Sequence, residues 1–129
     1  MFEDCEIIYT YTRKEAIEDG LQFRLGDELA QLAEEAGYKW PVYMTSGVWG
    51  LVEMAVNNKK HCNDLNGVLW DIFYMSRVTG QMLNNSLKAF DVIITGTGQR
   101  KIHKIYVECG PIDFDNPEPC LTFMLPDEN

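Results

Sequence analysis

The chain has 129 residues, of which 46% are hydrophobic, and it contains three Trp, six Tyr and six Phe. A chain of this length and composition is expected to form one domain, residues 1–129, around a single core, which argues against disorder. The formal net charge is −9, from 11 Lys plus Arg against 20 Asp plus Glu. A surface of that sign repels phosphate, so direct binding of nucleic acid is disfavoured.

The early part of the chain is expected to hold a strand and a short helix. Residues 7–11 are rich in β-formers and predict a short N-terminal strand. Thr12 and Glu15 fit a capping box, which predicts a helix over 13–19. The alternation of apolar and polar residues over 21–25 predicts an extended piece after it.

The clearest amphipathic helix is expected between Asp27, an N-cap candidate, and Gly37, whose freedom at positive φ suits a helix end. Pro41 forces Trp40 into an extended conformation. Residues 41–44 therefore read as a short linking or edge segment.

Two strongly apolar helices are predicted next, over 47–57 and 65–81. The second is apolar on two faces, and such a helix is expected to be buried on two sides. Trp49 and Trp70 are at helical spacing among apolar neighbours, so both are expected in the core.

The last forty residues read as a β-meander. Strands are predicted over 90–95, 102–110 and 120–126, joined by a hairpin turn at 96–101 and an acidic loop at 111–119. The predicted fold is therefore α+β: about four helices in the first two thirds, packed on a small antiparallel C-terminal β-meander that the N-terminal strand joins.

Three charged residues are candidates for a small-ligand pocket. Asp71 and Arg77 lie on the most apolar helix, and Arg13 lies at a helix N-terminus, where the helix dipole disfavours a cation. In a functional interpretation they surround a pocket near the turn at 109–111. In a structural interpretation Asp71 pairs with a cation elsewhere and Arg13 with a carboxylate such as Asp19 or Asp71. Structural ion pairs also occupy such positions, which favours the second interpretation.

No metal, cofactor or catalytic residue is predicted. The residues that raise the question of a metal are His61, Cys62, His103, Cys109 and Cys120. Their spacing lacks C-x-x-C and H-x-x-x-H, and the acidic loop lacks the glycine of a calcium loop. Gly96-Thr97-Gly98 lies between two strands, so it predicts a hairpin turn rather than a phosphate cradle. No nucleophile elbow or Ser/His/Asp arrangement is recognisable.

The compartment is expected to be a reducing cytoplasm. No secretory signal is recognisable in the acidic first residues, so the four cysteines are expected as free thiols. No apolar run approaches the roughly 20 residues of a membrane helix. The acidic surface suits either solubility or a partner with a basic surface, for which Asp113, Asp115, Glu118 and the partly exposed Trp40 are the predicted contacts.

Five segments of the chain form a set of motifs in a fixed order: YTRKEAIEDG (11–20), AEEAGYKWPVYMTSGVW (33–49), LWDIFYMSR (69–77), VECGPIDFDNPEP (107–119) and LTFMLPDE (121–128). Together they resemble a domain-of-unknown-function family of small proteins from phages, plasmids and other mobile elements. The Asn-rich segments 57–66 and 84–86 depart from the pattern. The resemblance implies an accessory protein of a mobile element in the cytoplasm of a bacterial host. It carries over no catalytic residue.

Two functions follow as expectations. The first is an acidic accessory protein that binds and modulates a protein partner, for example as an inhibitor of a host defence nuclease complex of the anti-restriction or anti-CRISPR type. The alternative is a small-ligand-binding protein or enzyme with a pocket near Asp71 and Arg77. The absence of recognised catalytic motifs favours a protein without enzymatic activity, and a homo-oligomer stays open.

Overall fold

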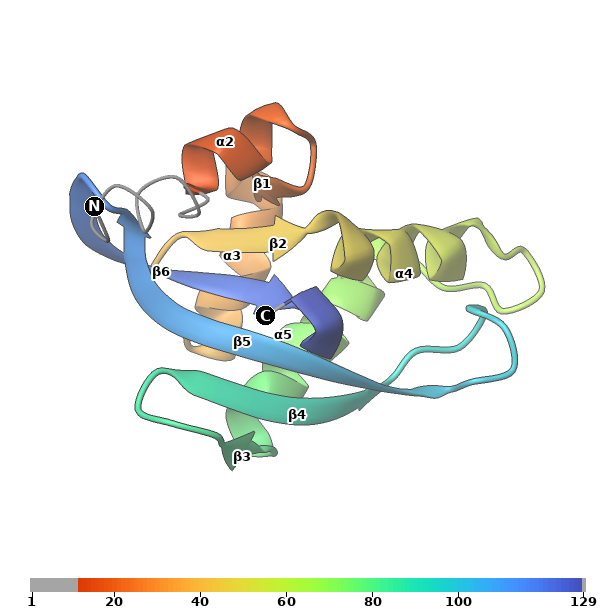
Figure 1. Ribbon diagram of the computed structural model, residues 1–129. Helices are drawn as coiled ribbons and strands as arrows, with labels where there is room; N and C mark the ends of the chain where they lie inside the picture. Colours follow the sequence, from red (N-terminus) through yellow and green to blue (C-terminus); the bar gives the residue numbers. More distant parts are fainter. Residues whose placement is uncertain (1–11, 129) are drawn as a thin grey trace.

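The computed structural model describes residues 12–128, and over that range it confirms the α+β class (Figure 1). The elements in chain order are α2 (Arg13–Glu18), β1 (Gln22–Arg24), α3 (Asp27–Ala36), β2 (Val42–Thr45), α4 (Ser46–Asn57), α5 (Leu65–Val78), β3 (Gln81–Met82), β4 (Leu87–Ile93), β5 (Ile102–Asp113), β6 (Asn116–Met124) and a 3₁₀ turn, η1 (Pro126–Glu128). The strand expected at 7–11 lies outside the described residues. The sequence predicts helices in the first two thirds of the chain only. The 3₁₀ turn η1 follows the last strand, so this part of the prediction is wrong.

The first two helices begin and end where local chemistry requires. The Thr12 hydroxyl accepts a hydrogen bond from the Glu15 N–H at 3.1 Å, which confirms the predicted cap of α2. Helix α3 ends at Gly37, which has a φ of +115° and turns the chain out of the helix. Its N-cap is Gly26 rather than Asp27, which lies inside the first turn.

Helix α5 is shorter than predicted. It ends at Val78 instead of 81, because Gly80 takes a φ of +103° and brings the chain against β4. A Cβ on Gly80 would lie 2.5 Å from the backbone oxygen of Ala89. The close approach leads directly into the short strand β3, which pairs with β4. Apolar periodicity gives no sign of such a backbone contact.

The predicted meander is present but belongs to a larger, mixed sheet of order β1-β2-β6-β5-β4-β3. Strands β4, β5 and β6 pair antiparallel, as expected, and β4 starts at Leu87 rather than at 90. The expectation that 41–44 is a linking or edge segment is wrong. Strand β2 lies inside the sheet, antiparallel to β1 and parallel to β6, and all four of its residues are buried.

The segment 111–119, predicted as a loop, is mostly strand. Strand β5 runs to Asp113 and β6 starts at Asn116, with an irregular register between Pro111 and Asp113. Pro111 pairs opposite Pro119, so neither position supplies an N–H to the ladder there. Because proline is uncommon inside strands, these residues predicted a loop, although the two strands pair across them.

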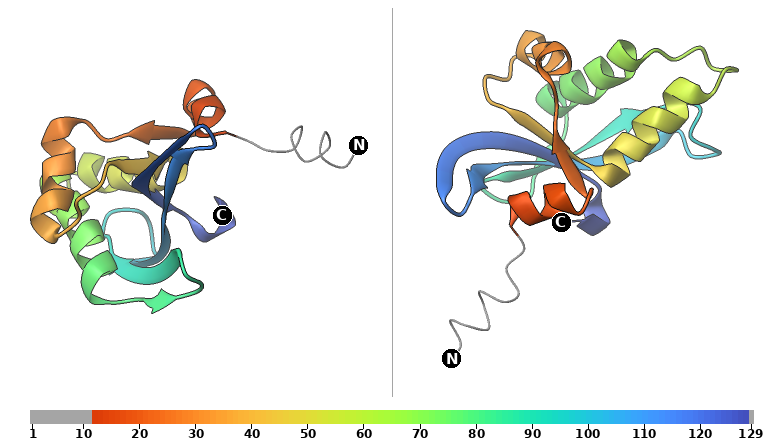
Figure 2. Two further views of the ribbon diagram at one scale, coloured as in Figure 1. Left: turned by 90° about the vertical axis from the view of Figure 1, so that its left-hand side faces the viewer. Right: turned by 90° about the horizontal axis from the view of Figure 1, so that it is seen from above.

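Strand alternation gives the sheet two different faces. Helices α3, α4 and α5 cover one face, and α2 and the C-terminal turn lie on the other (Figure 2). The helix-covered face carries the core, in which the buried ring of Phe123 meets Phe73, Phe90 and Tyr38 edge-on, with ring centroids 5.3–6.3 Å apart. On the other face the Glu128 carboxylate accepts a hydrogen bond of 2.7 Å from the Thr45 hydroxyl, which ties η1 to the start of α4.

The two tryptophans expected in the core lie only half-buried at its margin. Trp49 packs edge-on against Phe23, and Trp70 stacks on Tyr74, which is 47% exposed. Helix α5 is buried on its sheet-facing side only, so the expectation of burial on two sides is wrong. Leu69, Ile72 and Phe73 make that buried side. Aromatic side chains at helical spacing showed that the helix is apolar, but not which of its faces meets the sheet.

Candidate functional site

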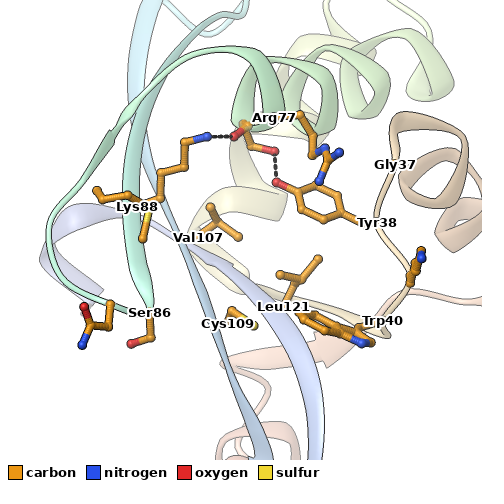
Figure 3. A pocket seen from close by; sticks show the side chains of 13 residues that line it. Gly37, Tyr38, Trp40, Arg77, Ser86, Lys88, Val107, Cys109 and Leu121 are labelled. Carbon is orange, nitrogen blue, oxygen red and sulfur yellow. Dashed lines mark hydrogen bonds between the residues drawn. The ribbon is translucent and has the colours of Figure 1, made fainter.

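A cavity of about 480 Å³ opens on the helix-covered side, where four parts of the chain meet (Figure 3). We call it the cationic pocket. Its polar and aromatic lining is Tyr38, Lys39 and Trp40 from the α3–β2 connection, Ser76 and Arg77 from the end of α5, Asn85 and Ser86 from the β3–β4 connection, and Lys88 from β4. Val107 and Cys109 of β5 and Leu121 of β6 form an apolar floor.

The side chains of Lys88 and Arg77 are held at one end of the pocket by a hydrogen bond and a cation–π contact. Lys88 is on the helix-facing side of β4, and its ammonium donates a hydrogen bond of 2.6 Å to the carbonyl of Ser76 (Figure 3). The Arg77 guanidinium lies over the Tyr38 ring at 5.3 Å from its centroid. A Cβ on Gly37 would be 2.9 Å from Arg77 Nη2, so the glycine that ends α3 also leaves room for the arginine.

Tyr38 is held in a fixed orientation between these groups. Its hydroxyl lies 2.6 Å from Ser76 Oγ, and Ser76 Oγ lies 2.6 Å from the carbonyl of Phe73. Because the Ser76 hydroxyl donates to that carbonyl, the Tyr38 hydroxyl donates to Ser76. Burial raises the pKa of Tyr38, and it outweighs the opposing effects of Ser76 and the Arg77 charge. Tyr38 therefore stays a neutral phenol.

The other end of the pocket is apolar. Trp40 is 45% exposed, and its indole lies beside Leu121 and Cys109 (Figure 3). Burial raises the pKa of the Cys109 thiol, so this sulfur is kept as an uncharged thiol. The pocket thus has a cationic end at Arg77 and Lys88 and an apolar end at Trp40.

The charge of the pocket is opposite to that of the chain. No Asp or Glu is among its described lining residues. Within residues 12–128, neither Lys39, Arg77 nor Lys88 has a carboxylate oxygen within 4 Å, since the ion pair there joins Lys104 to Asp91. Three cations and no described carboxylate therefore line one cavity of a chain whose net charge is −9.

The residues predicted for a ligand pocket separate in the structure. Arg77 and Cys109 line the cationic pocket, whereas Arg13 lines a different cavity of about 430 Å³ beside Gly110 and Pro111. Asp71 is exposed on α5 and lines neither of these cavities, and desolvation raises the pKa of its carboxyl. The residues at 109–111, expected as a turn, lie within strand β5.

Arg13 has an intramolecular role, with other partners than those expected. Its guanidinium donates to Gln22 Oε1 at 2.8 Å and to the Ile112 carbonyl, and it lies 4.2 Å from the centroid of the Tyr43 ring. These contacts fasten α2 to the sheet, and the Arg13 charge also acts on the carboxylate of Asp113.

The predicted partner-binding residues lie in two separate regions. Trp40 belongs to the cationic pocket, while Asp113, Asp115 and Glu118 lie around the β5–β6 hairpin, with Phe114 74% exposed at its tip. Asp115 and Glu118 are exposed.

The Asp113 carboxylate binds the N-terminus of α2. Its carboxylate accepts hydrogen bonds from the backbone N–H groups of Lys14 at 3.1 Å, Phe114 at 3.0 Å and Arg13 at 3.4 Å. Desolvation alone would raise the pKa of Asp113, but these hydrogen bonds and the Arg13 charge together hold it below its usual value.

The histidine and cysteine candidates do not come together. Within residues 12–128, no three His, Cys, Asp or Glu side chains lie close enough to hold a metal ion. His103 is buried, and its Nε2 lies 2.8 Å from the Thr97 hydroxyl. Cys109 and Cys120 lie on opposite faces of the sheet, because Cys109 pairs with Leu121.

Sequence reasoning missed most of the polar lining of the pocket, namely Tyr38, Lys39, Ser76, Asn85, Ser86 and Lys88. A signal was available for some of them. Tyr38 and Lys39 form an aromatic–cation–aromatic run with Trp40 between a helix-ending glycine and Pro41, and Lys88 is a cation between apolar residues. Ser76 looks like an ordinary helix residue and has no such signal.

The sequence of the chain was compared with models of protein families, with curated proteins and with solved structures. The model of one family, described as "Family of unknown function (DUF6573)", matches residues 1–129. The chain belongs to this family. Neither a curated protein nor a solved structure matches it. Within residues 12–128, the helices are too short or too polar to cross a lipid bilayer.

Proposed function

We propose that this protein binds a small anionic ligand in the cationic pocket. The observation that carries the proposal is that Lys39, Arg77 and Lys88 line one cavity without a carboxylate within 4 Å among the described residues. Cations gathered in this way repel one another, and an anion relieves that repulsion. A cavity of about 480 Å³ also falls in the size range of small-ligand sites.

The lining favours binding over catalysis. General acid–base chemistry needs a group whose pKa lies near the operating pH, and His, Asp and Glu are absent from the described lining. Tyr38 and Cys109 line the pocket, but burial raises the pKa of both, so neither is an activated base or nucleophile. The ligand is therefore held rather than transformed.

Titration calorimetry with a panel of small anions tests this function. Arg77→Gln and Lys88→Met each remove one charge from the pocket and are expected to raise the Kd of a bound anion about tenfold or more, as for lost charge-assisted hydrogen bonds. Lys104→Met is the matched control, because Lys104 pairs with Asp91 outside the pocket. Equal weakening by Lys104→Met, or no binding of any anion, would contradict the proposal.

A second candidate is the binding of a protein partner, and the β5–β6 hairpin favours it. Phe114 is 74% exposed between Asp113 and Asp115, which gives an apolar anchor with an acidic rim, while the hydrogen bonds of Asp113 to α2 brace the hairpin. In this proposal the protein is an accessory factor of a phage or other mobile element. It acts in the cytoplasm of a bacterial host on a partner with a basic surface, such as a defence nuclease complex.

Capture from a lysate of the infected host tests this second candidate. Phe114→Ala and the pair Asp115→Lys with Glu118→Lys are expected to lose a partner that the wild-type chain retains, and retention should weaken with added salt. Glu53→Lys, on the exposed side of α4, is the control for charge reversal alone. Capture that ignores the hairpin variants would count against this candidate.

A further inference from the structure

We infer that the ligand of the cationic pocket is a mononucleotide, that is, a planar base carrying a single phosphate group. The inference rests on the proposed anion-binding function and adds the chemical class of the ligand. It comes from the two unlike ends of one cavity, each of which matches one part of such a molecule.

The cationic end has unused hydrogen-bond donors. The five N–H groups of Arg77 make no hydrogen bond within the described residues, and the one hydrogen bond of Lys88 goes to the Ser76 carbonyl, which leaves two of its donors. A phosphate monoester carries a charge between −1.5 and −2 near neutral pH and offers three strong acceptor oxygens. With Lys39, the pocket supplies enough positive charge for such a group, more than one carboxylate requires.

The apolar end suits a planar ring. Trp40 is 45% exposed and borders the cavity beside Leu121, while Tyr38 is held by its hydrogen bond to Ser76 (Figure 3). A flat heterocycle that covers the indole removes apolar surface from water and gains stacking energy. An inorganic anion would leave this end of the pocket unused.

The charge of the whole chain limits the length of the ligand. A net charge of −9 repels an extended polyanion, whereas the field of three nearby cations dominates inside the pocket. A single nucleotide places its one phosphate among these cations. Every further phosphate of a polynucleotide would add to the repulsion by the net negative charge of the chain.

Calorimetry with dissected ligands tests the inference on the full-length protein. The probes are AMP, GMP, CMP and UMP, together with adenosine, ribose 5-phosphate, inorganic phosphate and a 5′-phosphorylated ten-nucleotide DNA strand. At least one monophosphate is expected to bind about tenfold or more tightly than its nucleoside and than ribose 5-phosphate, because each of these lacks one of the two contacts. The DNA strand is expected to bind more weakly than the mononucleotide.

Variants assign each part of the ligand to its end of the pocket. Trp40→Ala is expected to weaken the monophosphate about tenfold and to leave ribose 5-phosphate unchanged, whereas Arg77→Gln weakens both. Tyr74→Ala is the matched control for removal of an exposed aromatic ring, because Tyr74 is 47% exposed and lies outside the pocket. Lys39→Gln removes a charge from the α3–β2 connection and is expected to weaken the monophosphate and ribose 5-phosphate alike. Thermal unfolding of each variant shows whether the fold is intact.

The outcomes separate this inference from the proposed function. If ribose 5-phosphate or inorganic phosphate binds as tightly as every monophosphate, the base has no role and the inference is overturned, while anion binding stands. If adenosine binds as tightly as AMP, the phosphate has no role and the inference is overturned as well. Tighter binding of the DNA strand overturns the mononucleotide, and failure of every anion to bind overturns the proposed function itself.

Discussion

At the residue scale, Asp113 joins two segments that are about 100 residues apart in sequence. Its carboxylate accepts from the backbone N–H groups of Arg13 and Lys14, the first two residues of α2. Anions stabilise helix N-termini, and besides Asp113 the Thr12 hydroxyl also accepts a hydrogen bond from a backbone N–H in the first turn of α2. We expect Asp113→Asn to lower the free energy of unfolding by about 0.5–1 kcal/mol near neutral pH, as measured by urea denaturation.

The same carboxylate gives a pH dependence of known sign. Because the folded state holds the pKa of Asp113 below that of the unfolded chain, its contribution is present above the unfolded value of about 3.9 and is lost as the pH falls through the folded value. The stability difference between wild type and Asp113→Asn should therefore shrink below about pH 4. Asp115→Asn, at the exposed hairpin tip, is the control, and a difference that is constant with pH would contradict this role.

At the element scale, the glycines of the two central helices are a matched pair. Gly50 lies in the middle of α4, and a Cβ there would meet nothing within 4 Å. Gly50→Ala should therefore raise the free energy of unfolding by about 0.5–1 kcal/mol through helix propensity alone. Urea denaturation measures this gain directly.

Gly67 in the first turn of α5 has different surroundings. A Cβ there would lie 2.7 Å from Oδ1 of Asp64, whose carboxylate caps this helix by accepting from the Gly67 N–H. Gly67→Ala should therefore gain less than Gly50→Ala, because the cap must move to make room. If the two substitutions stabilise equally, the Asp64 cap contributes little.

At the scale of the whole molecule, Phe123 connects the sheet to the helices. Its ring is fully buried and meets Phe73 of α5 and Phe90 of β4. Phe123→Ala should cost about 3–5 kcal/mol, a large share of the stability of a domain of this size. Phe114→Ala, at an exposed position, should change stability by no more than about 0.5 kcal/mol. Thermal unfolding of the two variants checks the contrast.

The net charge also acts on the whole molecule. With −9 charges and the single ion pair Lys104–Asp91 within the described residues, repulsion among surface carboxylates opposes the compact state. Raising the salt concentration from about 0.01 to 0.1 M shortens the Debye length from about 30 to 10 Å and should raise the Tm. Sucrose at the same osmolarity is the control, and a Tm that falls with salt would contradict this balance.

Local chemistry in the sequence determined the ends of some elements. Thr12 with Glu15, Gly37 and Gly96–Gly98 made the start of α2, the end of α3 and the β4–β5 turn predictable, because caps and tight turns depend on residues next to one another. The α+β class followed from the same signals. The acidic surface was also readable, since charge is a property of composition.

Only the tertiary structure decided what those elements form together. The parallel pairing of Val42 with Leu121 joins segments that no local pattern relates, and it turned a linking segment into an interior strand. The cationic pocket arises in the same way: Tyr38, Arg77 and Lys88 come from three separate parts of the chain and converge because α5 packs against both α3 and β4. Arg77 was a candidate from sequence, but its distance from Arg13 was not readable, because tertiary packing decides which residues of separate elements come together.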